Sequence, residues 1–269
     1  MRSRRLRPKL NYKAYLLDLD GTVYLGDDLI PAADEVIGAL RAAGCRVMFL
    51  SNKPIATRAS YAEKLTRLGI RATADDVLNS SQALAAYLGP RMPGAKAYVI
   101  AEKPVIDDLV AAGLQVVDDP HGAEVVVASW DREFSYRKLN DALQAIRAGA
   151  QFVATNPDVA CPMPGDKYVP DCGAIVAAIE ACSRTKVELY GGKPSPVMGE
   201  MALNRLGVAP HECLMVGDRV DTDILFGHNA GMATALVLTG AGRLTPLHEA
   251  PAPPDMILDS IADLVADDV

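Results

Sequence analysis

Two aspartates one residue apart, Asp18 and Asp20, end an apolar run that begins at Tyr15. In extended chain they project from the same side, and two carboxylates held close need a cation or a shared proton. Gly21 permits a tight turn, and the amides that follow, including that of Thr22, can point at an anion. The stretch could therefore hold a divalent metal ion and a phosphate together, although so short a pattern is also compatible with a surface turn.

Three later groups of the same kind follow apolar runs. Ser51 and Asn52 offer a hydroxyl and an amide to a phosphoryl oxygen, although a serine here is also typical of a helix cap or turn. Lys193 follows two glycines, and its compact charge suits phosphate, although a loop lysine is usually solvated. Asp218 and Asp223 are hard oxygen ligands of the kind that Mg²⁺ takes together with water, and capping of a helix is the alternative role for this acidic stretch.

Alternating strand and helix patterns must position these groups. Helices are expected over 31–44 and 57–69, where apolar residues recur at helical spacing, and the order β-α-β-α indicates an α/β fold with a parallel sheet. Such sheets keep their binding sites at the carboxyl ends of the strands. The predicted strands are 14–19, 46–52, 97–101, 124–129, 152–155, 187–192, 214–218 and 234–238, and the remaining predicted helices are 81–88, 104–112, 135–148, 173–183, 195–207 and 222–229.

The longest irregular stretch covers residues 155–173 and holds four prolines, so regular structure is not expected there. Long loops in compact proteins are often functional. Candidate substrate contacts flank this loop, although the first two can also simply build its turn: Asn156, Asp158, Tyr168 and Asp171.

Composition excludes several classes of protein. A net charge of −7 argues against a general nucleic-acid binder, and no apolar run is long enough to cross a membrane. Residues 1–12 are basic without a following apolar signal core, so we expect a disordered tail and no secretion. The five cysteines lie at scattered spacings, which favours reduced thiols and a cytoplasmic protein.

The motifs, taken in order, resemble those of the haloacid dehalogenase superfamily. "DLDGTVYLGD", "TNPD", "GGKPSP" and "GDRVDTDI" are similar to the NagD-like, 4-nitrophenylphosphatase branch, which carries a large α/β cap. The resemblance implies a Rossmann-like core over 13–80 and 187–269, with a cap that sets specificity inserted over 81–186. At the second motif, many relatives have a segment similar to "TNN", whereas this chain has Ser51-Asn52-Lys53-Pro54. The added charge makes Lys53 a candidate for specificity.

The same resemblance implies roles for the motif residues. Asp18 would be the nucleophile, and Asp20 the general acid and then the base. Mg²⁺ would be held by the Asp18 carboxylate, the Asp20 carbonyl and Asp218, with Asp223 orienting the ligands or bound water. Phosphate would be held by Ser51, Asn52 and Lys193 and by the turn at Gly21 and Thr22.

We therefore expect an Mg²⁺-dependent phosphatase that acts through an aspartyl-phosphate on a small phosphomonoester. A sugar phosphate, glycerol phosphate, phosphoglycolate or nucleoside monophosphate would fit, and 4-nitrophenyl phosphate should be hydrolysed. The alternative is a non-catalytic sensor of phosphorylated metabolites that keeps the fold. No nucleic acid or membrane is expected as a partner, whereas the resemblance makes a homodimer through the cap possible.

Overall fold

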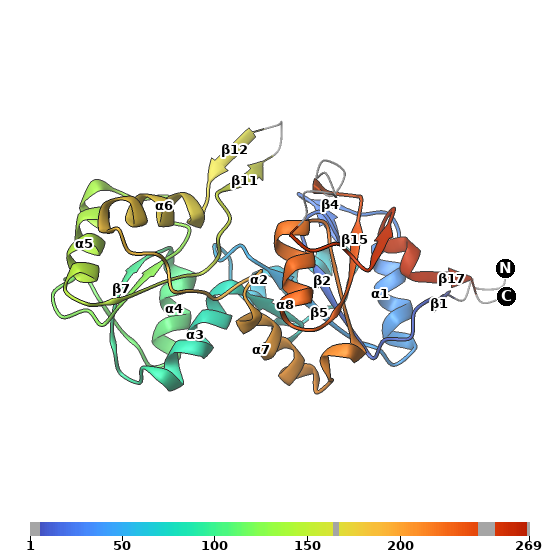
Figure 1. Ribbon diagram of the computed structural model, residues 1–269. Helices are drawn as coiled ribbons and strands as arrows, with labels where there is room; N and C mark the ends of the chain where they lie inside the picture. Colours follow the sequence, from blue (N-terminus) through green and yellow to red (C-terminus); the bar gives the residue numbers. More distant parts are fainter. Residues whose placement is uncertain (1–5, 164–166, 242–250, 268–269) are drawn as a thin grey trace. The chain divides into compact units, whose positions relative to one another are not determined.

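The computed structural model describes residues 6–163, 167–241 and 251–267 (Figure 1). Contacts divide the chain into two compact units: unit 1 comprises Met1–Ser51, Arg58–Leu78 and Gly199–Val269, and unit 2 comprises Asn52–Thr57 and Asn79–Met198. Unit 2 extends further toward the C-terminus than the insertion expected over 81–186. The reason is β13 (Leu189–Tyr190), which pairs with β10 (Gln151–Ala154) of unit 2.

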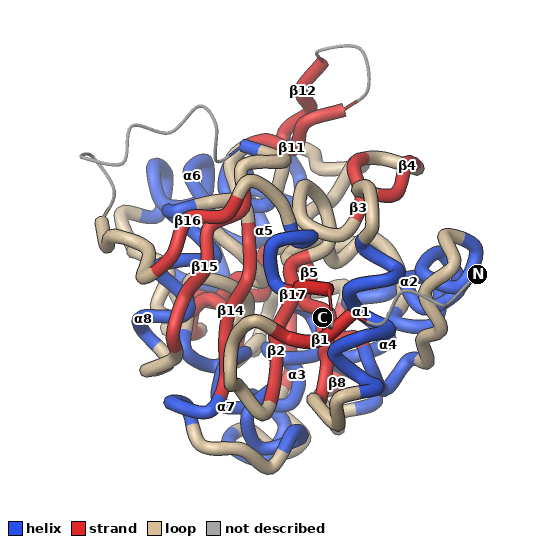
Figure 2. Tube along the Cα trace, turned by 90° about the vertical axis from the view of Figure 1, so that its right-hand side faces the viewer, coloured by secondary structure: helices blue, strands red, loops and turns tan. Residues whose placement is uncertain are grey.

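Unit 1 is built on a six-stranded sheet with the order β16-β15-β14-β2-β5-β6, and Figure 2 shows several of these strands side by side. Parallel pairing joins β2 to β5 and to β14, and continues through β15 to β16. This confirms the predicted α/β fold with a parallel-sheet core. The strands are β2 (Ala14–Asp18), β5 (Arg46–Ser51), β6 (Val77–Asn79), β14 (Cys213–Gly217), β15 (Ala233–Val237) and β16 (Met256–Leu258).

The strand order of unit 1 reverses at one place. The chain leaves β2 toward β5 and β6, and later returns to form β14 on the other side of β2. The connecting loops therefore diverge between β2 and β14, which makes this the topological switch point where α/β sheets bind ligands. The helices and helical turns of this unit are α1 (Ala33–Ala42), α2 (Arg58–Arg67), η1 (Ala74–Asp76), η2 (Pro210–Glu212), η3 (Val220–Ile224), α8 (Leu225–Asn229) and η6 (Ile261–Leu264), and α7 (Pro196–Leu206) begins in unit 2 and ends in unit 1.

Unit 2 has a parallel sheet of its own, with the order β13-β10-β9-β7-β8. Its remaining strands are β7 (Lys96–Ile100), β8 (Gln115–Val117) and β9 (Val125–Ala128). Its helices are α3 (Ser80–Arg91), α4 (Lys103–Ala111), α5 (Tyr136–Arg147) and α6 (Cys172–Ser183).

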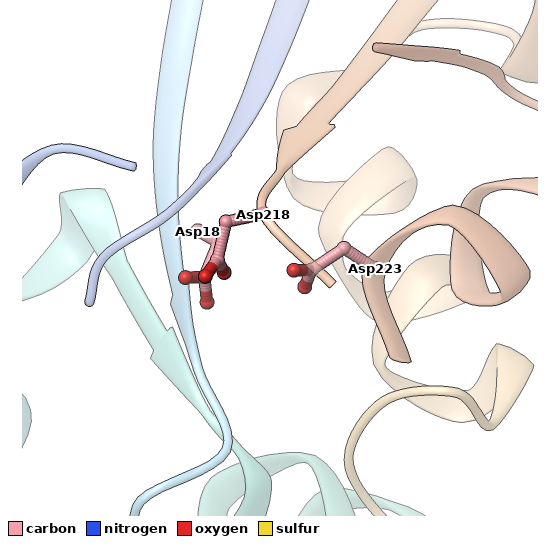
Figure 3. A group of neighbouring side chains, drawn as sticks. All are labelled: Asp18, Asp218 and Asp223. Atoms are coloured by element: carbon pink, nitrogen blue, oxygen red, sulfur yellow. The ribbon is translucent and has the colours of Figure 1, made fainter. Parts of the chain in front are cut away.

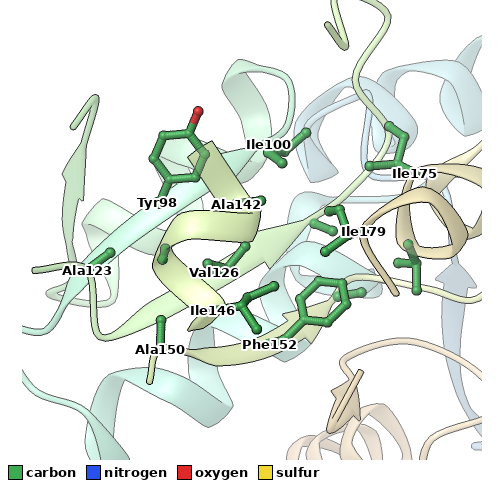
Figure 4. Close-up of a cluster of buried hydrophobic side chains, with 14 of the residues drawn as sticks. Tyr98, Ile100, Ala123, Val126, Ala142, Ile146, Ala150, Phe152, Ile175 and Ile179 are labelled. Atoms are coloured by element: carbon green, nitrogen blue, oxygen red, sulfur yellow. The ribbon is translucent and has the colours of Figure 1, made fainter. Parts of the chain in front are cut away.

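Side chains on successive strand positions of unit 2 enter different cores, because they point to opposite faces of the sheet. Val126 and Phe152 pack in a cluster with residues of α5 and α6 (Figure 4), whereas Val125 and Val153 pack with residues of α3 and α4. Helices thus cover both faces of this sheet, as the near-continuous apolar strands require.

Two segments that we expected to be irregular form strands. In the proline-rich loop, β11 (Ala160–Met163) and β12 (Lys167–Pro170) pair as an antiparallel ladder. In the basic tail, β1 (Leu6–Pro8) pairs with β17 (Val265–Asp267), so the expected disorder is wrong there, whereas residues 1–5 lie outside the described residues. Both ladders are held by backbone hydrogen bonds, which do not depend on a recognisable pattern of side chains in the sequence.

No helix among the described residues has the length and apolar character that a membrane span requires.

Candidate active site

Three aspartates from separate segments of unit 1 form a carboxylate cluster. Asp18 is the last residue of β2, Asp218 follows β14, and Asp223 lies in η3. One carboxylate oxygen from each lies within 4.8 Å of those of the other two, and all three residues are buried (Figure 3). The cluster forms because β2 and β14 are parallel neighbours that end together at the switch point.

Glycines allow the backbone to lie directly against this cluster. A Cβ on Gly21 would lie 2.4 Å from Asp218 Oδ2, and one on Gly240 would lie 2.0 Å from the same atom. A Cβ on Gly217 would lie 2.4 Å from Asp223 Oδ2. Since Cβ atoms essentially never come that close to another heavy atom, any other residue at these positions would displace a carboxylate.

Backbone amides orient two of the carboxylates. The Ala241 N–H donates to Asp218 Oδ2 at 2.6 Å, and the Arg219 N–H donates to Asp223 Oδ2 at 3.1 Å. Thr239 Oγ1 donates to the Gly21 carbonyl at 2.6 Å and so ties the turn after β15 to the turn after β2. The sequence analysis did not identify residues 239–241 as part of the site. The available signal was their position directly after the predicted strand 234–238.

The cluster fits a magnesium ion. Three buried carboxylates within reach of one another repel unless a cation or protons compensate their charge. Carboxylate oxygens are hard ligands, and Mg²⁺ is usually bound by a few of them with water completing the octahedron. Asp18, Asp218 and Asp223 would hold it, whereas the Asp20 side chain is not part of the cluster.

The turn after β2 presents Asp20. Three successive amides, those of residues 22–24, donate to the Leu19 carbonyl, and the Gly21 N–H donates to the Tyr24 carbonyl at 2.7 Å. Gly21 has φ +96°, a conformation that glycine adopts without steric cost. Asp20 is partly exposed, whereas Thr22 is fully buried and its hydroxyl has no hydrogen-bond partner among the described residues. The amides of residues 21–24 thus donate within the turn, so the structure does not show the anion contact that we expected at Gly21 and Thr22.

Ser51 is the last residue of β5, the strand next to β2 on the side away from β14. Its Oγ donates to the Tyr61 hydroxyl of α2 at 3.3 Å. Strand order thus puts Asp218, Asp18 and Ser51 at the ends of three adjacent strands, whereas Lys193 follows β13, which belongs to the sheet of unit 2.

The next residue, Asn52, is the centre of a buried network in unit 2. Its Nδ2 donates to Asp158 Oδ2 at 2.9 Å and to the Lys193 carbonyl at 3.0 Å, and its Oδ1 accepts from the Lys193 N–H at 2.9 Å. Its carbonyl accepts from Ser80 Oγ and Asn156 Nδ2. The side-chain amide that we expected to face phosphate therefore donates to protein groups, and what it does here is hold Lys193.

Gly191 and Gly192 bring the Lys193 segment into this network. A Cβ on Gly192 would lie 2.5 Å from Asn52 Oδ1, and one on Gly191 would lie 2.5 Å from the Leu84 Cβ. Lys193 itself is 2% exposed. The two glycines that precede the lysine are thus explained by close packing, and not only by a turn.

The candidates for substrate contact divide into buried and exposed residues, and Asp158 is a buried one that accepts from Asn52. Asn156 Oδ1 accepts from the Asp158 N–H at 3.0 Å, which builds the turn, and Asp171 Oδ1 accepts from the Cys172 N–H as the N-cap of α6. Both residues are buried, so their structural roles are the ones that the geometry supports. Tyr168, on β12, is 66% exposed, and Lys53 is partly exposed.

Comparisons with known proteins agree with this geometry. A family model described as haloacid dehalogenase-like hydrolase matches residues 15–115, and a model described as HAD-hydrolase-like matches residues 190–264. The sugar-phosphatase AraL of Bacillus subtilis (strain 168) is 38% identical over 249 residues, which cover 93% of this chain and 90% of AraL.

Solved structures show the same likeness over the whole fold. A p-nitrophenyl phosphatase from Archaeoglobus fulgidus matches with a TM-score of 0.88 at 30% identity, covering 94% of this chain and 98% of that one. NagD from E. coli K-12 matches with a TM-score of 0.84 at 32% identity and the same two coverages. A glycerol phosphate phosphatase from Mycobacterium tuberculosis, solved in complex with magnesium, matches with a TM-score of 0.86 at 30% identity, covering 96% and 77%. The chain therefore belongs to the haloacid dehalogenase-like hydrolases, in the branch that contains NagD and the 4-nitrophenylphosphatases.

Proposed function

We propose that this hydrolase is an Mg²⁺-dependent phosphatase that removes the phosphoryl group of a small phosphomonoester through an aspartyl-phosphate. The observation that carries the proposal is the carboxylate cluster at the switch point, where Asp18, Asp218 and Asp223 bring one oxygen each within 4.8 Å of the others. A bound Mg²⁺ would offset the negative charge of the phosphoryl group and of the attacking carboxylate.

The residues of the chain would divide the remaining work. Asp18 attacks phosphorus, and the bond from phosphorus to the leaving oxygen breaks while Asp20 gives that oxygen a proton. Asp20 then takes a proton from water, whose oxygen attacks phosphorus and releases Asp18 and inorganic phosphate. On the strength of their motif positions, we assign Ser51 and Lys193 to the non-reacting phosphoryl oxygens, which carry charge in the transition state.

The substrate class rests on two kinds of support. Relatives that match nearly the whole chain are named for sugar phosphate, p-nitrophenyl phosphate and glycerol phosphate, all small phosphomonoesters. Exposed Tyr168 and partly exposed Lys53 are the candidates to contact the rest of the substrate, because Asn156, Asp158 and Asp171 are buried and hydrogen-bonded within unit 2. We therefore expect polar, hydroxyl-bearing substrates to be preferred over bulky apolar ones.

The test is hydrolysis of 4-nitrophenyl phosphate with Mg²⁺ and after treatment with EDTA, in wild type, Asp18→Asn and Asp75→Asn. Asp75 is the matched control, because its side chain is 97% exposed on the same unit. We expect activity to depend on metal, to survive Asp75→Asn and to be lost in Asp18→Asn.

Acid quenching with ³²P-labelled substrate should trap a phosphoenzyme in wild type and none in Asp18→Asn. Turnover by Asp18→Asn above a few per cent of wild type would overturn the covalent mechanism. Tight binding of phosphorylated metabolites without any turnover would instead favour the sensor.

A further inference from the structure

A short hairpin follows the Asp20 turn directly. It consists of β3 (Tyr24–Leu25), a turn at Gly26 and Asp27, and β4 (Asp28–Leu29). Tyr24 joins the hairpin to the turn, because its carbonyl accepts from the Gly21 N–H and it forms an isolated bridge with Asp20. Any movement of the hairpin is therefore passed to Asp20 through backbone hydrogen bonds.

One side chain from α2 holds this hairpin at three points. The Lys64 ammonium donates to the Gly26 carbonyl at 2.6 Å and lies 3.3 Å from Asp27 Oδ1. It also lies 3.9 Å from the centre of the Tyr24 ring, a cation–π contact. The Lys64 side chain is only 22% exposed, so its contacts with Gly26 and the Tyr24 ring are less weakened by solvent than those of a surface lysine, whereas Asp27 is 95% exposed and its pair with Lys64 is screened. We call this set of contacts the Lys64 clamp.

Tyr24 connects the Lys64 clamp to the turn that holds Asp20. The residue is 3% exposed, and burial, followed by the neighbouring Tyr61 and Asp20, raises the pKa of its phenol far above the ordinary value. Tyr24 is therefore neutral throughout the physiological range, and its ring lies against the Lys64 ammonium while its backbone is bonded to the Asp20 turn. The same helix that supplies Lys64 also supplies Tyr61, whose hydroxyl accepts from Ser51.

We propose that Lys64 is a positioning residue for Asp20, which fixes the hairpin and thereby the geometry in which Asp20 protonates the leaving group. The inference rests on the proposed phosphatase function. Proton transfer from a positioned acid contributes about 10²–10⁴-fold, and much of this gain depends on the acid lying within hydrogen-bond reach of the leaving oxygen. Loosening the hairpin should therefore reduce the rate most for substrates whose leaving group is a poor one.

The experiment measures kcat/KM for a series of substituted phenyl phosphates and one alkyl phosphate in wild type and Lys64→Met. In the variant we expect kcat/KM to fall about 10-fold or more for the alkyl phosphate, but about 2-fold or less for 4-nitrophenyl phosphate, whose leaving group needs little protonation. The slope of log kcat/KM against leaving-group pKa should become steeper, since the leaving oxygen then carries more charge.

Two further variants separate positioning from general damage. Lys64→Arg keeps a cation over Tyr24 and should retain the wild-type slope. Lys103→Met removes a lysine that pairs with Asp107 at 2.6 Å on unit 2 and should also leave the slope unchanged. A merely structural role for Lys64 would lower the rate for every substrate by the same factor.

The outcomes distinguish the inference from the function on which it rests. An unchanged slope in folded Lys64→Met, with wild type active, would overturn the clamp. A wild type that hydrolyses none of the esters would overturn the proposed phosphatase instead. If circular dichroism shows Lys64→Met unfolded, Lys64→Gln, which can still donate to the Gly26 carbonyl, should give a steeper slope, and the wild-type slope there would reject the inference.

Discussion

At the scale of single residues, the carboxylate cluster combines negative charge with burial, so a cation or protons must compensate that charge. Asp223 is 1% exposed and Asp218 is 4% exposed, and both accept a backbone N–H that fixes their orientation. Groups that orient metal ligands usually matter nearly as much as the ligands themselves. The energetics of the site should therefore depend on individual carboxylates, and not on the overall acidity of the segment 218–223.

Asp223→Asn and Asp221→Asn test this point as a matched pair. Asp223 belongs to the cluster, whereas Asp221 is 62% exposed and pairs with the Arg219 side chain at 2.9 Å. We expect Asp223→Asn to lower Mg²⁺ affinity about 10–100-fold, because a charged oxygen near the ion becomes a neutral amide. Asp221→Asn should stay close to wild type. Calorimetric titration with Mg²⁺ measures both, and equal losses would mean that only the net charge of the segment matters.

The residues of the carboxylate cluster could be predicted from the sequence. The hydrogen-bond network around Asn52 in unit 2 could not. Asp18 ends one apolar strand, Asp218 directly follows another, and strand ends in a parallel sheet meet at one edge. Asn52, in contrast, bonds Asp158 and Lys193, which lie more than 100 residues away and follow no shared periodicity. Its role in holding the lysine could only come from the structure.

At the scale of elements, residues 239–241, which follow β15, contact the site although none of the three carries a charged side chain. Thr239, Gly240 and Ala241 contact Gly21 and Asp218 through one hydroxyl, one missing Cβ and one amide. Small residues are needed here because the turn passes so close to the Asp218 carboxylate. These contacts are therefore made by one hydroxyl and by the backbone, and by no charged side chain of these three residues.

Gly240→Ala should damage metal binding more than it damages the fold. Its Cβ would lie 2.0 Å from Asp218 Oδ2 and 2.8 Å from the Gly21 Cα, so either the carboxylate or the turn must move. Forcing extra atoms into such a site typically costs about 1–3 kcal/mol of stability, and the displaced carboxylate should also raise the Mg²⁺ concentration needed for half-maximal activity.

Gly38→Ala is the control for that variant. Gly38 lies in α1 with nothing within 4 Å of the added Cβ, so alanine should stabilise the helix by about 0.5–1 kcal/mol. Thermal unfolding and Mg²⁺ activation curves for the two variants check the prediction. A Gly240→Ala protein with the wild-type Mg²⁺ requirement would show that Asp218 is not confined by the turn.

Most of the longer elements were predictable and most of the shortest ones were not, although the predicted strand 187–192 contains the two-residue β13. Helices such as α1 and α5 carry an apolar face at helical spacing, and strands such as β2 and β14 are continuous buried runs. β16 and β17 have three residues each, too few to show a period of two against chance. The hairpin of β11 and β12 contains prolines, and proline is tolerated in strands at edges, which a two-stranded ladder consists of entirely.

At the scale of the molecule, the two units have separate sheets and separate cores, and the carboxylate cluster draws on unit 1 alone. Phe152→Ala in the core of unit 2, where the side chain is fully buried, should cost about 3–5 kcal/mol of stability. We expect peptides of unit 2 to exchange amide hydrogens faster while Mg²⁺ affinity stays near wild type. Hydrogen exchange by mass spectrometry and calorimetry measure the two effects, and a parallel loss of metal affinity would contradict independent cores.

The order of segments along the chain has a consequence for synthesis of the protein on the ribosome. β14 pairs with β2 in the middle of the sheet, so Asp18 meets the other two carboxylates of the cluster only after about 200 further residues have been added. At about 5–20 residues per second this interval lasts roughly 10–40 s, long enough for the sheet of unit 2 to leave the exit tunnel first. A nascent chain would thus carry an unassembled carboxylate edge throughout this interval, and the carboxylate cluster would form only after residues 213–223 have emerged.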